Sequence, residues 1–370
     1  MTEALELRKK NDALRRLIPF DPSFADFSSN DYLGIARSTE FIDLVDGKKK
    51  QNDQLFGSGG SRLLSGNSTF AEETERSFAQ HFGTEAGLIF NSGYAANCGI
   101  FGCIPKKGDT IIFDELIHAS VRDGMRMSHA RSWSFRHNDL DHLKELIDRA
   151  EGEIFVAVES IYSMDGDACP LKEIVRICEE RNANLILDEA HSTGLFSANG
   201  KGFAVAEEVQ ERIFARVHTF GKAMGCHGAF VAGNELLRNY LINFSRTFIY
   251  STALPVHDIM VMRSSMDFIN SHPELQQKLN ENVRYFRESA RVNELCLENS
   301  DSAIHALIVP GNEKAKQLAE HCRKQKLDVR AVLAPTVPEG KERLRIIIHA
   351  FNTKEDIDKL IQQLILDKSY

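Results

Sequence analysis

The chain has 370 residues, of which 42% are hydrophobic and 26% are charged, and its formal net charge is −8. This length predicts about two or three domains, and this composition is typical of a soluble globular protein with a sizeable core. The acidic balance argues against nucleic acid as the main partner, because proteins that bind it usually gather Lys and Arg on one face.

The beginning of the chain, MTEALELRKKNDALRRL, predicts a charged amphipathic helix over residues 1–17 rather than a signal peptide. No apolar run in the sequence approaches the ~20 residues that a membrane span needs. Seven scattered cysteines without a Cys-x-x-Cys pair favour reduced thiols over disulfides or a zinc site. We therefore expect a cytoplasmic protein with no metal site and no membrane partner.

From about residue 85, short apolar runs alternate with amphipathic helices such as 139–151 and 171–182. This alternation predicts a mostly parallel sheet with helices on both faces, whose ligands bind outside the carboxyl ends of the strands. The predicted strands are AGLIF (86–90), TIIFDE (110–115), IFVAVES (154–160), NLILDEAH (184–191), RVHTFGK (216–222) and GAFVAG (228–233).

After residue 255 the pattern predicts a smaller α+β unit. A long charged helix at 273–292 precedes the apolar segments AIHALIVP, VRAVLAPTVP and RLRIIIHA. We predict three parts: an N-terminal helix and arm at 1–40, a large α/β domain at 41–255 and a small α+β domain at 256–370.

The stretch NLILDEAHSTG (184–194) contains the letters DEAH, which also occur in nucleotide-driven helicases. Such a motor needs a G-x-x-x-x-G-K-[ST] loop to hold the phosphates. None of the four Gly-Lys pairs in this sequence is followed by Ser or Thr, which excludes the helicase. The Gly-rich segment GSGGSRLLSG (57–66) is either a flexible turn or a loop that lets the backbone approach a ligand closely.

Asp188 and Lys222 each follow a predicted strand. A lysine amine forms an imine with an aldehyde cofactor. A carboxylate opposite the pyridine nitrogen of pyridoxal phosphate keeps that nitrogen protonated, so that the ring withdraws electrons from the substrate carbon. The pair therefore suits Schiff-base chemistry, whereas a lysine like Lys222 considered alone is more often a solvated surface charge.

The sequence resembles the α-oxoamine synthases. DEAH is followed about thirty residues later by TFGK and is preceded by NSGYAAN (91–97), DELIHAS (114–120) and YSMDGD (162–167). The resemblance runs from ALRRL and FSSNDYLG to PTVPEGKERLRI, essentially the whole chain. It implies a fold-type I, aspartate-aminotransferase-like enzyme with a mostly parallel seven-stranded sheet between helices and a smaller α+β domain. It also implies bound pyridoxal 5′-phosphate and a homodimer with the active site at the interface.

The resemblance assigns the catalytic roles to Lys222, Asp188 and His118. Lys222 is expected to bind the cofactor aldehyde and to remove the substrate Cα proton, Asp188 to pair with the ring nitrogen, and His118 to stack on the ring and contact the substrate. His191 is expected to contact the phenolic oxygen, with a loop-stabilising role as the alternative. The other expected cofactor contacts are Ser163, Thr219, Thr252 toward the neighbouring subunit, and the helix start Ser92, Gly93 and Tyr94, for which a plain helix cap is the alternative.

Substrate contacts are carried over in the same way. Arg345 is expected to grip the amino-acid carboxylate, since a planar fork suits bidentate pairing. Arg343 shares its strand face by period two, so spacing alone does not choose between the two arginines. Asn30 is expected to assist at the carboxylate, and His349 to position the substrate. Arg15 is expected to bind the acyl substrate, with a solvated helix charge as the alternative.

Within the family, FIYSTALP (248–255), DALRRL, SMDGDACPL and APTVPEGKERLR most resemble the 8-amino-7-oxononanoate synthases. The implied reaction of this acyltransferase joins L-alanine to pimeloyl-CoA, or its carrier-protein thioester, giving 8-amino-7-oxononanoate, CoA and CO2 in biotin biosynthesis. Glu189 departs from that branch's pattern and receives no role at the cofactor. The alternatives are 2-amino-3-ketobutyrate CoA ligase, 5-aminolevulinate synthase, serine palmitoyltransferase, and a lyase or aminotransferase on the same fold.

Overall fold

The computed structural model describes residues 1–50 and 57–366. Its chain divides into two compact units. The larger unit comprises Gly34–Tyr162 and Ala168–Pro273, and the smaller one comprises Met1–Leu33, Ser163–Asp167 and Glu274–Tyr370. The sequence-based boundaries at 40 and 255 therefore differ from the division by contacts, because residues 256–273 pack within the larger unit.

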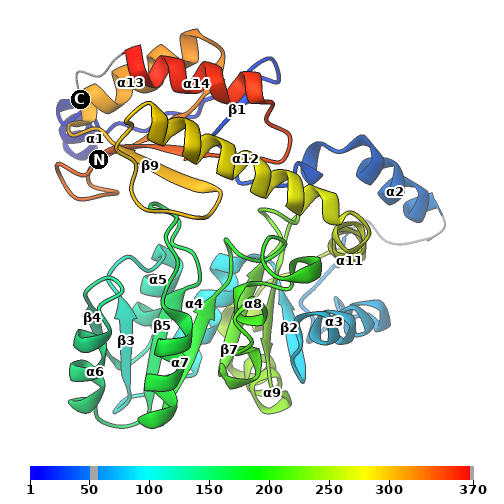
Figure 1. The fold of residues 1–370 in the computed structure, drawn as a ribbon. Coiled ribbons are helices and arrows are strands. Elements are labelled where there is room, and N and C mark those ends of the chain that lie inside the picture. The colour runs from blue at the N-terminus through cyan, green and yellow to red at the C-terminus, as the bar shows by residue number, and fades with distance from the viewer. Residues whose placement is uncertain (51–56, 367–370) are drawn as a thin grey trace. The chain divides into compact units, whose positions relative to one another are not determined.

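A seven-stranded sheet forms the centre of the larger unit, in the order β2-β8-β7-β6-β5-β3-β4 (Figure 1). The five strands β7, β6, β5, β3 and β4 run parallel to one another, whereas β8 runs antiparallel to both of its neighbours, β2 and β7. The expected mostly parallel, seven-stranded sheet is thus confirmed. The strands are β2 (Ala86–Phe90), β3 (Thr110–Asp114), β4 (Arg131–Phe135), β5 (Ile154–Glu159), β6 (Ala183–Asp188), β7 (Ala215–Thr219) and β8 (Ala229–Gly233).

The six strands predicted from apolar runs all form. Four of them end before the predicted runs do: β3 and β5 by one residue, and β6 and β7 by three, at Asp188 and Thr219, where the chain turns into polar loops. The strand that the sequence did not reveal is β4, at the edge of the sheet. Its residues RSWSF are mostly exposed, so they lack the apolar signal of a central strand.

Helices cover both faces of this sheet. One face carries α4, α5 and α9, whose buried side chains form one hydrophobic cluster with strand residues that run from β2 to β3 in the sheet order. The other face carries α6 and α7, whose buried side chains cluster with residues of β3, β4, β5 and β6. The helices of the larger unit are α2 (Thr39–Lys50), α3 (Thr69–Phe82), α4 (Gly93–Cys103), α5 (Ala119–Met127), α6 (Leu140–Asp148), α7 (Leu171–Glu180), α8 (Phe203–Ala206), α9 (Glu235–Phe244), α10 (Arg246–Ile249) and α11 (Val256–Ser271).

The smaller unit contains an antiparallel sheet in the order β11-β12-β9 and a separate parallel pair, β1 with β10. It is the α+β unit that the C-terminal pattern predicts. Its strands are β1 (Ala25–Asp26), β9 (Ile304–Ile308), β10 (Leu327–Asp328), β11 (Arg330–Val332) and β12 (Arg343–Ile347). Its helices are α1 (Thr2–Lys10), α12 (Pro273–Val292, whose first residue groups with the larger unit), α13 (Asn312–Lys324) and α14 (Lys354–Leu366).

The N-terminal helix is shorter than the sequence predicts. It ends at Lys10, and Asp12 then adopts a φ of 52°, in the left-handed region that terminates helices. No residue of α1 is buried, so the helix lacks the tertiary packing that sustains longer amphipathic helices. The prediction of a helix through residue 17 is therefore wrong, and Arg15 lies beyond the helix.

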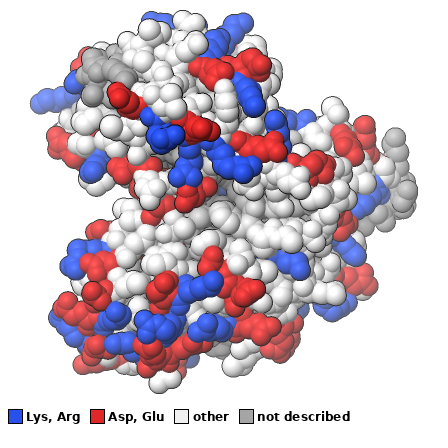
Figure 2. Space-filling model, viewed as in Figure 1, with Lys and Arg blue, Asp and Glu red and all other residues white. Residues whose placement is uncertain are grey.

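Charges of both signs are mixed over the surface drawn in Figure 2. Among the described residues, no helix is long and apolar enough to cross a membrane.

Candidate active site

Polar side chains replace apolar ones at the carboxyl ends of three adjacent strands in the larger unit. Ala157 on β5 and Ile186 on β6 belong to the hydrophobic core. Because side chains alternate along a strand, the next residues on that same face are Glu159 and Asp188, and Thr219 ends β7 in the equivalent way. We call Glu159, Asp188 and Thr219 the floor of the site.

A cavity of about 220 Å³ opens above this floor. It lies entirely within the larger unit. Eight of the ten predicted cofactor contacts line it, and only Ser163 and Thr252 do not. Its lining residues are Ser92, Gly93, Tyr94, Asn97, His118, Ser120, Glu159, Asp188, Ala190, His191, Thr219, Gly221, Lys222, His227 and Gly228.

Asp188 is 6% exposed and is held by two hydrogen-bond donors. The side-chain amide of Asn97 donates to Oδ2 at 2.7 Å, and the backbone N–H of Ala190 donates to Oδ1 at 2.9 Å. Donors of this kind favour the ionised form of a carboxyl group. The site therefore presents a fixed negative charge at the end of β6.

Lys222 reaches the cavity from the turn that follows β7. Its Nζ lies 3.0 Å from Nε2 of His191, on the loop after β6. The turn is tight: the backbone N–H of Gly225 donates to the Lys222 carbonyl at 2.8 Å. Gly225 has a φ of +64°, and a Cβ there would lie 2.6 Å from the backbone nitrogen of Ala36. Glycine is thus required to aim the lysine.

His118 caps the start of α5 at the side of the cavity. The backbone N–H of Ser120 donates to its Nδ1 at 3.2 Å, so a neutral ring carries its proton on Nε2. Burial lowers the pKa of His118, and the negative charge of Asp188 opposes that effect only in part. The side chain is therefore a neutral imidazole at pH 7.

The start of α4 forms another side of the cavity. Ser92 is its N-cap and accepts a hydrogen bond from the backbone N–H of Ala95 at 3.1 Å. A Cβ on Gly93 would lie 2.4 Å from Cγ2 of Thr219, so only glycine fits there. The free amides and the dipole of a helix start attract an anion. The helix cap and the anion site are therefore both consistent with this geometry.

Glu189 has a role that the sequence did not suggest. It is fully buried, and its Oε2 accepts hydrogen bonds from Ser192 Oγ at 2.7 Å and from the backbone N–H of Ala204 at 3.4 Å. Its Oε1 lies 3.5 Å from Nη1 of the buried Arg216. Glu189 thus anchors the loop that carries His191, although it does not line the cavity itself.

Three predicted residues come together in the smaller unit. Arg345 on β12 donates from Nε to the backbone carbonyl of Ser163 at 2.6 Å and from Nη2 to Oδ1 of Asn30 at 3.1 Å. Among the described residues, no carboxylate pairs with Arg345. Arg343, in contrast, forms an ion pair with Asp165 and is 5% exposed. Of the two arginines, Arg345 is therefore the one with charge available for a ligand.

The remaining predicted residues lie elsewhere. His349 is fully buried in the smaller unit, where its Nε2 lies 2.9 Å from the Ser29 carbonyl and its Nδ1 lies 3.2 Å from Oδ1 of Asn352. These contacts support a structural role for that ring. Thr252 is exposed, and its backbone carbonyl accepts a hydrogen bond from Asn91 at 2.9 Å.

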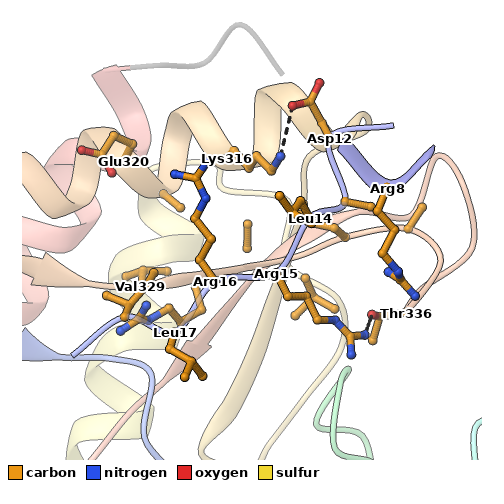
Figure 3. Close-up of a pocket in the computed structure, with 18 of the residues that line it drawn as sticks. Arg8, Asp12, Leu14, Arg15, Arg16, Leu17, Lys316, Glu320, Val329 and Thr336 are labelled. Carbon is orange, nitrogen blue, oxygen red and sulfur yellow. Dashed lines mark hydrogen bonds and ion pairs between the residues drawn. The ribbon is translucent and has the colours of Figure 1, made fainter. Parts of the chain in front are cut away.

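Arg15 lines a second cavity, of about 1010 Å³, within the smaller unit (Figure 3). Its Nη2 donates to Oγ1 of Thr336 at 3.0 Å. Arg8 and Arg16 line the same cavity, and none of these three arginines has a carboxylate partner in the described part of the chain. The cavity is therefore rich in cationic groups that are free to bind an anionic ligand.

Comparison with known proteins gives a consistent result. The aminotransferase class I and II family matches residues 22–364. The 8-amino-7-oxononanoate synthase of Emericella nidulans is 38% identical over 98% of this chain and 94% of its own. That of Citrobacter koseri is 36% identical over 98% of this chain and 97% of its own. This chain belongs to the α-oxoamine synthases, within aminotransferase class I and II.

Solved structures of α-oxoamine synthases share the fold. Serine palmitoyltransferase from S. paucimobilis, with a bound PLP–myriocin aldimine, has a TM-score of 0.86 at 28% identity and covers 92% of this chain and 86% of its own. An 8-amino-7-oxononanoate synthase from Francisella tularensis has a TM-score of 0.82 at 26% identity, with coverages of 95% and 99%. The fold-type I architecture is thereby confirmed.

The cavity of this α-oxoamine synthase fits pyridoxal phosphate on the chemistry of its own groups. The start of α4 suits the phosphate, the Lys222 amine suits the aldehyde and the Asp188 carboxylate suits the ring nitrogen. Two buried acceptors, Asn97 Oδ1 and Glu159 Oε1, have no donor among the described residues.

Asn97 and Glu159 line the cavity but were not predicted from the sequence. Asn97 ends the motif NSGYAAN and lies one turn into α4, which begins at Gly93. That position in the motif could have indicated that its side chain lines the cavity. Glu159 ends an apolar strand, where a single acidic residue resembles an ordinary boundary.

Proposed function

We propose that this α-oxoamine synthase condenses L-alanine with a pimeloyl thioester, of CoA or of a carrier protein, to give 8-amino-7-oxononanoate, free thiol and CO2 in biotin biosynthesis. The observation that carries the proposal is the convergence of Lys222, Asp188 and His118 in one cavity. The sequence similarity adds to this observation, because the chain matches curated 8-amino-7-oxononanoate synthases over nearly its full length.

Pyridoxal phosphate, when bound, supplies an electron sink that stabilises negative charge on the substrate carbon. The protein's own groups do the remaining work. Lys222 Nζ holds the aldehyde in the resting enzyme and moves the proton at the substrate Cα. Asp188 keeps its negative charge through the donors Asn97 and Ala190, and so holds a proton on the ring nitrogen.

The two histidines have distinct tasks in this proposal. His118 is a neutral ring at the side of the cavity, where it would contact the bound cofactor and present its Nε2 proton as a hydrogen-bond donor. His191 contacts Lys222 directly, which supports a role beside the ring oxygen nearest the aldehyde. The anchor at Glu189 fixes the loop on which His191 lies.

Arg345 binds the carboxylate of the amino-acid substrate in this proposal. Two observations on the arginines of β12 support this role. Arg343 is neutralised by Asp165, whereas Arg345 donates to neutral oxygens of Asn30 and Ser163. A guanidinium group with neutral partners retains the charge that bidentate pairing with a carboxylate requires.

The cationic cavity of the smaller unit favours an acyl group with a charged end. Arg15, Arg8 and Arg16 line it. A pimeloyl chain ends in a carboxylate, whereas a palmitoyl chain ends in a methyl group that gains nothing from arginine. This observation supports pimeloyl over palmitoyl as the acyl group, although serine palmitoyltransferases are among the structures that share the fold.

The substrates of the chain are an amino acid and an acyl thioester, and its assembly is part of the proposal. We infer a cytoplasmic homodimer with the active site at the subunit interface. The exposed side chain of Thr252 supports this inference, because a residue that contacts a neighbouring subunit's cofactor must lie on the surface of its own.

The test is a matrix of thiol-release assays. Alanine, glycine and serine are each combined with pimeloyl, acetyl, succinyl and palmitoyl thioesters, as CoA and carrier-protein forms. The proposal expects the highest kcat/KM for alanine with a pimeloyl thioester. Preference for serine with palmitoyl-CoA would instead identify a serine palmitoyltransferase, and turnover of amino acids without thiol release would identify a lyase or aminotransferase.

A further inference from the structure

Glu159 is a second carboxyl group on the floor of the cavity. It is 2% exposed and is paired in register with Asp188 across the parallel strands β5 and β6. Neighbouring strands lie about 4.8 Å apart, so registered side chains leave the sheet side by side. The roles proposed above for Lys222, His118 and Asp188 make no use of this residue.

The surroundings favour ionisation of Asp188 over Glu159. Asp188 has a donor on each oxygen. Oε1 of Glu159, in contrast, is buried and has no hydrogen-bond partner among the described residues. Two adjacent buried carboxyl groups do not both ionise readily, because each negative charge disfavours the other.

The charged groups that face Glu159 come from several elements. Burial and then the charge of Asp188 raise the pKa of Glu159 to about 8, and Asp114 on β3 adds to this effect. The ammonium group of Lys222 and the backbone N–H of His118 oppose it. The carboxyl group of Glu159 is therefore neutral at pH 7.

The hydrogen-bond inventory of the floor leads to the same assignment. Asn97 uses both protons of its amide, toward Ser120 at 3.0 Å and Asp188 at 2.7 Å. Its Oδ1 is buried without a donor, as is Oε1 of Glu159. Buried acceptors without donors are costly. A proton on Glu159 removes the negative charge from a buried carboxyl group whose Oε1 has no donor, which lowers the cost of burying it.

We propose that Glu159 is a positioning residue that carries a proton at neutral pH, so that Asp188 is the single negative charge on the cavity floor. This assignment rests on the proposed function only in taking Asp188 as the partner of the cofactor ring. It predicts that cofactor binding weakens at high pH. When Glu159 ionises, a second negative charge enters the cavity that must bind the dianionic phosphate of the cofactor, and cofactor affinity falls.

Infrared spectroscopy tests the protonation directly. Buried protonated carboxyl groups absorb apart from carboxylates, and the band moves when the carboxyl proton is exchanged for deuterium. The cofactor-free enzyme at pH 7 is compared with Glu159→Gln and with the control Glu151→Gln, which alters a surface residue with a 70% exposed side chain. We expect a band that Glu159→Gln removes, that Glu151→Gln keeps, and that disappears in the wild type above about pH 8. A band unchanged in Glu159→Gln overturns the proposal.

Cofactor affinity provides the functional test. Dissociation constants of pyridoxal phosphate are measured for the wild type and Glu159→Gln between pH 7 and 9.5. The ratio of the two constants is compared at each pH, so that pH effects common to both proteins cancel. We expect the ratio of wild type to variant to rise by about fivefold or more, since one added charge at close range weakens anion binding. A constant ratio contradicts the assignment.

Failure here is distinguishable from failure of the proposed function. Absence of thiol release from every thioester would refute the condensation reaction while leaving the infrared band in place. If thiol release is normal but no infrared band depends on Glu159, only the protonated state of Glu159 is refuted. Thermal unfolding of Glu159→Gln shows whether the variant is folded before either result is interpreted.

Discussion

Nζ of Lys222 lies 3.0 Å from Nε2 of His191, although the two residues follow different strands. The contact exists because β6 and β7 are parallel neighbours that end at the same edge of the sheet. It joins the two loops that carry the reactive groups, and Asp188 lies at the base of one of them. The chemistry of the site therefore depends on how precisely these loops are held.

Replacement of Lys222 by alanine should remove both the covalent link to the cofactor and the group that moves the Cα proton. We expect thiol release to fall by at least about 10²-fold, the lower end of general acid–base contributions. The visible absorption that borohydride bleaches in the wild type should be absent. Lys107→Ala, at an exposed position of the same unit, is the control and should behave like the wild type.

Arg345 and Arg343 should respond differently to substitution. Arg345→Lys loses the planar fork, and we expect the KM for the amino acid to rise by roughly 10- to 100-fold, as for the loss of a charged hydrogen bond. Arg343→Gln breaks the ion pair with Asp165 and should lower the free energy of unfolding by about 3 kcal/mol. Steady-state kinetics and urea unfolding of both variants separate the two effects. A larger KM effect in Arg343→Gln would reverse our assignment.

The buried pair of Glu189 and Arg216 should be sensitive to loss of one partner. Both side chains are buried, with 0% and 1% of their surface exposed. Glu189→Met leaves an unpaired buried guanidinium group, and we expect the free energy of unfolding to fall by about 3–5 kcal/mol. The double variant Glu189→Met, Arg216→Met removes both charges and should lose less. Equal losses in the single and double variants would show that the ion pair does not stabilise this loop.

Acid sensitivity should depend on His305 in the smaller unit. This ring is 1% exposed and contacts Phe286, and its burial lowers the pKa of His305 to about 3. Because the unfolded chain binds a proton near pH 6.5 and the folded chain does not, stability is lost as the pH falls from 6.5 toward 3.

For one such group the loss at pH 5 is about 2 kcal/mol. His305→Phe removes the titrating ring and should reduce the difference in unfolding free energy between pH 7 and pH 5 by that amount. His129→Gln, at an exposed histidine, should leave the difference unchanged. An identical pH dependence in wild type and His305→Phe would show that this histidine does not control acid unfolding.

Much of the fold and of the large-unit cavity could be predicted from the sequence. Continuous apolar runs mark strands that are buried on both faces. Asp188 ends one such strand, and Lys222 lies in the turn that follows another. The edge strand β4 was missed because its exposed side chains leave no apolar run. The end of α1 was missed because its periodic pattern continues past Lys10 although no packing sustains the helix.

The contributions of Glu159, Asn97 and Glu189 depend on tertiary contacts. Glu159 matters because it is in register with Asp188, and register is not visible in a single strand's sequence. Glu189 follows Asp188 directly, yet strand alternation turns it to the opposite side, where Arg216 neutralises it. A short sequence motif gives the residue types, but which of their side chains line the same cavity depends on the tertiary structure.

The most direct test of the proposed reaction follows one carbon atom. L-Alanine labelled with ¹³C in its carboxyl group is incubated with pimeloyl-CoA and the enzyme, and gas and solution products are analysed by mass spectrometry. The proposal predicts one labelled CO2 and one free thiol for each unlabelled 8-amino-7-oxononanoate formed, and none with Lys222→Ala. Label retained in the amine product, or thiol released without that product, would contradict it.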